Sequence, residues 1–195
     1  MPWLARGGPD LNLLPVRLLP SRARYSLTPL DFPPFFCYKP AIGGYRVTDL
    51  KAVDYLRKAE FIKNLEAVSD IQAIDTMLSA LSHKPEVADA AELRRAVFER
   101  QKMDPPLLAG GTAIPHARTD SVRSVVTAIA TSRFPIMFGE TPVRLMFLIG
   151  VPNAAVGEYL QITSFLARNL RGGHLLDRLM NAENIQQFVA AFAEG

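Results

Sequence analysis

The chain of 195 residues has a single cysteine and no long apolar run, and each shortage excludes a class of protein. With only Cys37, no disulfide can form within the chain, which favours a reducing compartment. Cys37 has no cysteine or histidine nearby at ligand spacing, so no metal site is predicted. The best apolar run, residues 145–151, is far shorter than the roughly 18 residues of a membrane span. We therefore expect a cytoplasmic protein without membrane insertion.

Outside the N-terminal part, the chain also lacks an excess of charge of either sign. The formal net charge is +3, but residues 1–46 hold six basic residues against two acidic ones. Residues 47–195 hold the other 16 basic and 17 acidic residues, which nearly balance. This part of the chain has no net attraction to a polyanion, so no nucleic-acid partner is expected.

Residues 1–46 also contain eight of the fifteen prolines, and no helical or strand period survives among them. We expect an irregular basic leader over 1–46 and a single domain over 47–195, because a chain of this length buries one sizeable core. The composition of the leader suits a transit peptide, and a start codon placed too far upstream would explain it equally well.

From Val47 onward, short apolar runs alternate with helical periods, as is typical of an α/β domain. Strands are predicted at 61–65, 124–132, 134–138 and 143–151. Helices are predicted from Ser69 or Asp70 to about 83, from Asp89 to about 102, from Gly157 to Gly172, and over 185–192. Their expected inward residues include Ile71, Ile74, Leu78, Leu81, Leu93, Ala96, Val97, Leu160, Phe165 and Leu166.

The stretch Gly110–Arg118, with sequence GGTAIPHAR, carries the clearest chemical signal. Glycines allow backbone amides to approach an anion, and proline restricts the backbone before His116. Histidine is the side chain best suited to act as a nucleophile near neutral pH. The stretch therefore suits a site that holds and passes on a phosphoryl group.

The motif FERQKM, which contains Arg100, precedes the sequence GTAIPH, whose histidine lies sixteen residues after that arginine. This arrangement resembles the enzyme IIA domain of the mannitol/fructose class of the bacterial phosphoenolpyruvate-dependent sugar phosphotransferase system. It is most similar to the nitrogen-regulatory branch. The resemblance implies an α/β fold with a mixed five-stranded sheet flanked by helices on both faces.

The resemblance also implies that phosphohistidine on the carrier protein HPr donates its phosphoryl group to His116. Positive charge is expected from Arg100 and Arg118, and no metal or other cofactor is required. Phosphate-binding amides are expected around the glycine pair, at Gly110, Gly111, Thr112 and Ala113.

Three features depart from the family pattern. Tyr159 stands where most relatives have a second histidine beside the phosphorylated one, and a phenol can donate a hydrogen bond but cannot carry positive charge. Prolines and apolar residues over 105–109 replace a loop of serine, threonine and glycine, and Gln101 replaces a glutamate.

Three functions remain open from the sequence. The chain is a phosphocarrier whose two charge states bind regulatory target proteins differently, or a sugar-delivery component that passes phosphate to a cysteine of a IIB domain, or a binding module without phosphotransfer. No IIB or IIC segment is fused to the given sequence, which favours the regulatory function.

Overall fold

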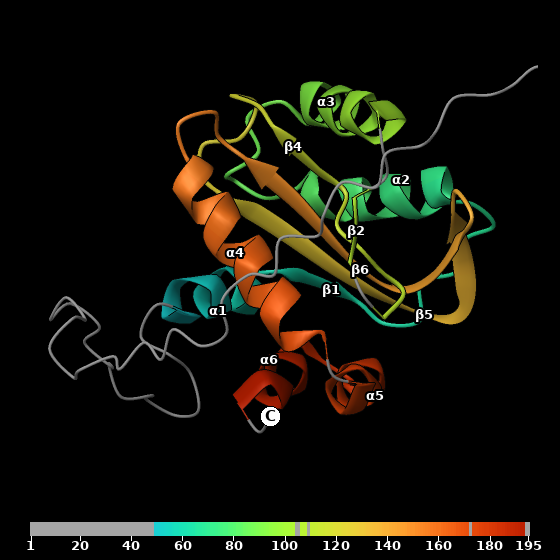
Figure 1. Ribbon diagram of the computed structural model, residues 1–195. Helices are drawn as coiled ribbons and strands as arrows, with labels where there is room; N and C mark the ends of the chain where they lie inside the picture. Colours follow the sequence, from blue (N-terminus) through green and yellow to red (C-terminus); the bar gives the residue numbers. More distant parts are fainter. Residues whose placement is uncertain (1–48, 104–105, 109, 172, 194–195) are drawn as a thin grey trace, which may run out of the picture. The chain divides into compact units, whose positions relative to one another are not determined.

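A mixed β-sheet forms the centre of the computed structural model, which describes residues 49–103, 106–108, 110–171 and 173–193 (Figure 1). The predicted leader, residues 1–46, lies outside the described residues. The strands follow the order β1-β5-β6-β3-β2, with β4 also paired to β6. Their bounds are β1 Glu60–Ile62, β2 Leu107–Leu108, β3 Thr112–Ala113, β4 His116–Arg118, β5 Val126–Phe138 and β6 Thr141–Val151.

Strands β3 and β4 are two halves of one interrupted strand. Both run parallel to β6, and the register continues from Thr112 opposite Leu145 to His116 opposite Ile149. The remaining pairs are β1 parallel to β5, and β5 with β6 and β2 with β3 antiparallel. The sheet thus has five strand positions, and the predicted mixed five-stranded sheet is confirmed.

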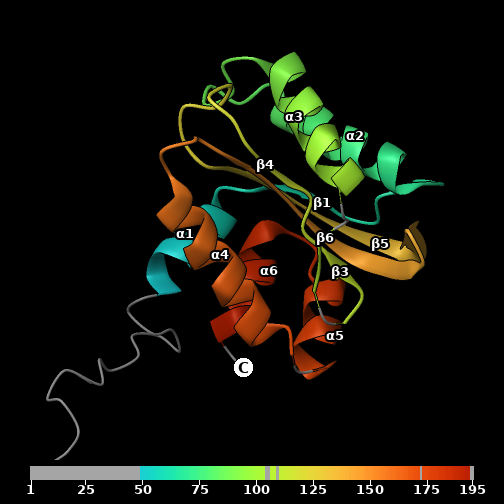
Figure 2. The same cartoon turned by 45° about the horizontal axis from the view of Figure 1, so that its top comes forward.

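Helices cover both faces of the sheet, as predicted (Figure 2). Side chains of α1, α4, α5 and α6 form one apolar cluster with the sheet, and side chains of α2 and α3 form the other. The helices are α1 Leu50–Arg57, α2 Asp70–Leu81, α3 Ala90–Met103, α4 Val156–Asn169, α5 Gly173–Asn181 and α6 Ile185–Ala193. Within the described ranges, none of them has the length and apolar character needed to cross a bilayer.

Strand β6 explains why the sequence carries an apolar run rather than an alternating pattern. Phe147 and Ile149 belong to the cluster with α1, α4 and α6, whereas Met146 and Leu148 belong to the cluster with α2 and α3. A strand that is buried on both faces needs apolar side chains in both directions.

Several predicted elements need correction. Helices α1 and α5 were not expected, and β5 is one strand with an irregularity between Thr131 and Ile136 rather than two strands. Ile71 is 60% exposed, because the buried face of α2 begins only at Ala73. Its first turn lies at the surface, where the Ser69 hydroxyl accepts a hydrogen bond from the Gln72 amide at 3.2 Å.

Candidate functional site

Strand β4 lies at an open edge of the sheet. Strand β2 pairs with β3 and does not extend beside β4, so the described strands leave the outer side of β4 uncovered. The Pro115 carbonyl accepts from the Ile149 amide at 3.0 Å, and the Thr119 amide donates to the Val151 carbonyl at 2.8 Å. Because successive residues of a strand alternate in direction, the backbone amides of His116 and Arg118 point away from β6.

Two hydrogen bonds hold the imidazole of His116. Its Nδ1 lies 2.9 Å from the Ile114 carbonyl oxygen, and its Nε2 lies 3.1 Å from the Tyr159 hydroxyl. A carbonyl oxygen can only accept, so Nδ1 carries the proton and the Tyr159 hydroxyl donates to the Nε2 lone pair. The two rings also pack together, with centroids 4.8 Å apart and planes tilted by 33°.

A cavity of about 640 Å³ opens beside this histidine, between α3 and α4. Arg100 from α3, Arg118 from β4 and Tyr159 from α4 line it together with His116. Three exposed apolar side chains form its apolar rim, namely Met103, Val156 and Leu160. Leu160 was predicted to be a core residue, but it is 55% exposed because it belongs to this rim.

Burial and two cations set the protonation of the central pair. Desolvation lowers the pKa of His116 below its ordinary 6.5, and Arg100 and Arg118 lower it further against the opposing effect of the Ile114 carbonyl. Desolvation raises the pKa of Tyr159, and the two arginines oppose this rise. At neutral pH the site therefore holds a neutral imidazole and a neutral phenol beside two positive charges.

The structure brings four of the predicted site residues together and leaves the others elsewhere. Gly110, Gly111, Thr112 and Ala113 are not among the residues that line the cavity. Thr112 and Ala113 are wholly buried, and Thr112 lies four residues before His116, roughly 13 Å along an extended strand. The amides that face the open edge beside the imidazole are instead those of His116 and Arg118.

The glycine pair has a structural explanation. Gly110 and Gly111 have φ values of +75° and +65° and form the turn before β3. A Cβ at Gly111 would lie 2.8 Å from the Pro142 carbonyl oxygen, whereas a Cβ at Gly110 would make its closest contact with Leu176 at 3.5 Å. Of the loop that departs from the family pattern, residues 105 and 109 lie outside the described residues, and Leu107–Leu108 form β2.

Two features of the site were missed in the sequence. The Ile114 carbonyl is a backbone group, so its contact with His116 could not be predicted from the type of residue 114. The apolar rim follows the same helical spacing as a core face, so periodicity alone could not separate the two.

The model of the family "Phosphoenolpyruvate-dependent sugar phosphotransferase system, EIIA 2" matches residues 54–195. The chain belongs to this family. The resemblance inferred from the histidine motif is thereby confirmed.

Relatives in this EIIA family have names from both sugar transport and nitrogen regulation. The fructose-specific EIIA component of Haloferax volcanii is 33% identical over 125 residues, which cover 63% of this chain and 81% of that protein. The nitrogen regulatory protein IIA-Ntr from Neisseria meningitidis superposes with a TM-score of 0.64 at 25% identity, covering 72% of this chain and 97% of that one. Enzyme IIAMTL of Escherichia coli, solved with phosphorylated enzyme IIBMTL, shares the fold with a TM-score of 0.60 at 20% identity, covering 70% and 95%.

The replacement Gly111→Ala should destabilise the fold more than Gly110→Ala. Both replacements force alanine into the left-handed region, at a cost of about 1 kcal/mol, but only the first also drives a Cβ into a backbone oxygen. Urea unfolding of both variants measures the difference. Equal losses of stability would contradict the structural role of Gly111.

The imidazole of His116 should titrate below pH 6.5 and should carry its proton on Nδ1 when neutral. Because burial depresses the folded-state pKa, its contribution to stability is complete above about pH 6.5 and is lost as pH falls through the folded-state value. Nitrogen-15 NMR of the ring measures both the midpoint and the tautomer, with the urea-unfolded chain as the reference. A midpoint at or above the unfolded value would refute this assignment.

Proposed function

We propose that this EIIA-family chain is a phosphocarrier that accepts a phosphoryl group on Nε2 of His116. The observation that carries the proposal is the orientation of the ring. Nδ1 is fixed on the Ile114 carbonyl, and Nε2 presents its lone pair beside a cavity lined by Arg100 and Arg118. Depression of the pKa of His116 keeps that lone pair available at neutral pH.

The transfer step needs no change in the protonation of His116. The Nε2 lone pair forms a bond to phosphorus as the nitrogen–phosphorus bond of a donor phosphohistidine breaks, and that electron pair returns to the donor imidazole. His116 keeps its Nδ1 proton, so the product is a phosphorylated imidazolium whose N–H is bound by Ile114 O. A cationic ring is a good leaving group, which keeps the phosphoryl group transferable.

Charge on the three phosphoryl oxygens would be balanced from several sides. Arg100 and Arg118 supply positive charge, and the edge amides of His116 and Arg118 supply donors that need little rearrangement. The Tyr159 hydroxyl, which donates to Nε2 in the free protein, would shift its hydrogen bond to a phosphoryl oxygen. As a phenol it adds a donor without adding charge.

The donor fits an HPr-like protein that carries phosphohistidine, because the apolar rim surrounds the cavity and offers a contact surface around the transfer point. As output we propose nitrogen regulation, in which target proteins distinguish the phosphorylated and free states in the cytoplasm. The relative from Neisseria meningitidis supports this output.

A second candidate is delivery of phosphate to a IIB domain during sugar uptake. The fructose-specific relative, at 33% identity, favours it. Enzyme IIAMTL, which shares the fold of this chain, was solved in complex with such a partner, phosphorylated enzyme IIBMTL.

Incubation with phosphoenolpyruvate, enzyme I and HPr should place an acid-labile, base-stable phosphate on the wild-type chain and none on His116→Ala. The half-buried side chain lies at an edge strand, so its loss should leave the circular dichroism spectrum unchanged. The chain has three histidines, and the exposed His83 and His174 provide matched alanine controls that should label normally.

A wild type that takes no label would leave the binding module as the function. Labelling of His116→Ala would place the phosphate elsewhere. Adding a IIB domain to the labelled chain then separates the two outputs, since discharge to its cysteine supports sugar delivery and retention supports regulation.

Replacing Tyr159 should change the transfer. Tyr159→Phe keeps the ring packing but removes one donor to the phosphoryl group, so the rate of phosphorylation should fall by on the order of tenfold, the value of one hydrogen bond to a charged group. Tyr159→His should raise the rate above that of the wild type, because an imidazole there can take up a proton as the negatively charged phosphoryl group arrives. Rapid-quench labelling measures both variants, and unchanged rates would show the tyrosine to be a bystander.

A further inference from the structure

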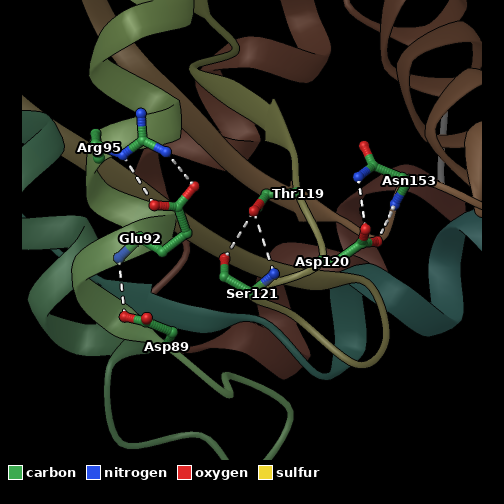
Figure 3. A network of polar contacts seen from close by, with 7 residues as sticks. All are labelled: Asp89, Glu92, Arg95, Thr119, Asp120, Ser121 and Asn153. Atoms are coloured by element: carbon green, nitrogen blue, oxygen red, sulfur yellow. Dashed lines mark hydrogen bonds and ion pairs between the residues drawn. The ribbon is translucent and has the colours of Figure 1, made fainter.

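The loop Thr119–Ser121, which we call the bracket, follows β4 directly and is hydrogen-bonded to the starts of two helices. Figure 3 shows its contact with Asn153 and the internal contact between Thr119 and Ser121. Toward α4, the Asp120 carboxylate accepts from the Asn153 side-chain amide at 2.9 Å and from the Asn153 backbone amide at 3.3 Å. Asn153 lies just before α4. The end of β4 is therefore tied to the beginning of α4.

Toward α3, the Ser121 carbonyl accepts from the amides of Ala88 and Asp89 at 2.8 and 3.1 Å. The Asp89 carboxylate then accepts from the Glu92 amide at 2.9 Å, which caps the first turn of α3. The same short loop thus also holds the start of α3.

The bracket is itself well ordered by internal contacts. Thr119 and Ser121 are each 6% exposed, and their hydroxyls lie 3.1 Å apart. The Ser121 amide also donates to the Thr119 hydroxyl at 3.2 Å, and the Thr119 amide donates to Val151 of β6. A loop held in this way can transmit the position of the sheet to the elements attached to it.

The three elements joined at the bracket carry the four side chains of the site. His116 and Arg118 are on β4, Arg100 is on α3 and Tyr159 is on α4. Helix α4 has no side-chain cap, because Ala155 stands at its N-cap position. The Asp120–Asn153 contact therefore holds the N-terminal end of α4. A carboxylate near this end also interacts favourably with the helix dipole.

Tyr159 lies four residues after Ala155, which is about 6 Å along the helix. A displacement of the helix start by a few tenths of an ångström would carry the tyrosine with it. The Tyr159 hydroxyl lies 3.1 Å from Nε2 of His116, and this hydrogen bond would be weak at about 3.5 Å. A small displacement is therefore enough to weaken it.

We infer that Asp120 is a positioning residue for His116, acting through Asn153 and α4 to hold the Tyr159 hydroxyl on Nε2. Its effect on transfer rests on the proposed function, whereas its effect on the histidine–tyrosine contact exists in the free protein.

A cavity of about 510 Å³ adjoins the bracket, but its carboxylates already have partners. Asp89 holds the Glu92 amide, Glu92 pairs with Arg95 at 2.7 Å, and Asp120 holds Asn153. These contacts favour positioning over ligand binding by the acidic residues.

The test is a double-mutant cycle of Asp120→Ala and Tyr159→Phe in the full chain, with two readouts. In the free protein, Asp120→Ala should move the nitrogen-15 shift of His116 Nε2 in the same direction as Tyr159→Phe. In phosphorylation by HPr, each single variant should be slower by on the order of tenfold, and the double variant no slower than Tyr159→Phe alone.

Companion variants separate positioning from general damage. Asn153→Ala removes the same contact from the other side and should reproduce both effects, which keeps the test valid if Asp120→Ala folds poorly. Asp120→Asn retains an acceptor oxygen and should restore part of the rate. Asp54→Ala removes an exposed carboxylate of α1 that pairs with Arg57 at 3.4 Å, and it should change neither readout.

An unchanged Nε2 shift in Asp120→Ala, or rate losses that multiply in the double variant, would overturn the inference. A wild type that takes no phosphate while the Nε2 shift responds as expected would overturn the proposed function and support the positioning role. The two proposals therefore fail on different measurements.

Discussion

The site depends on the Ile114 carbonyl, which lies where the strand is interrupted between β3 and β4. Pro115 has no amide hydrogen to donate to β6, although its carbonyl still accepts from Ile149, and the Ile114 amide bonds to the Pro106 carbonyl at 2.8 Å. The Ile114 carbonyl is then available to Nδ1 of His116, two residues later. This contact fixes the tautomer, and the tautomer decides which nitrogen would be the nucleophile of the proposed transfer.

In the proposed transfer, positive charge and directional hydrogen bonding come from different side chains. Arg100 and Arg118 provide the positive charge, and the same charge helps burial to keep His116 neutral. Tyr159 provides a directional hydrogen bond and retains its proton, since burial raises its pKa. With a second imidazole in place of the phenol, one group would supply both charge and direction, and its contribution would change with pH. The phenol removes that dependence from the neutral range.

The sequence predicted the helices and strands that carry long apolar patterns. It also predicted the site residues whose side chains are reactive, charged or able to donate hydrogen bonds. Strand β6 was found from its apolar run and helices α2, α3 and α4 from their periods, and His116, Arg100, Arg118 and Tyr159 meet at one cavity. Strands of two or three residues, such as β2 and β3, are too short to show a period. The eight-residue α1 follows directly on the proline-rich leader, and its buried set of Ala52, Val53 and Leu56 is too small to stand out.

The glycine pair illustrates why residue type alone does not decide whether a tight turn binds phosphate. A positive φ and a close backbone approach need glycine whether the neighbouring group is a phosphate or, as at Gly111, the carbonyl of Pro142. Only the fold distinguishes the two, because it shows on which side of the chain the neighbour lies. The same holds for Leu160, whose spacing suits a core face but whose position is the mouth of the cavity.

The cavity combines charged side chains with an apolar rim, so a binding partner could distinguish two charge states of the site. Without phosphate, a partner would meet Arg100, Arg118 and Glu99 beside the apolar rim. A phosphoryl group on Nε2 would make the local charge less positive while leaving the apolar rim in place. Apolar contacts would then contribute to binding in both states, and the charge at the centre would decide which partner is preferred. The proposed switch would act at the edge strand β4, where His116 lies, and would need no movement of the sheet.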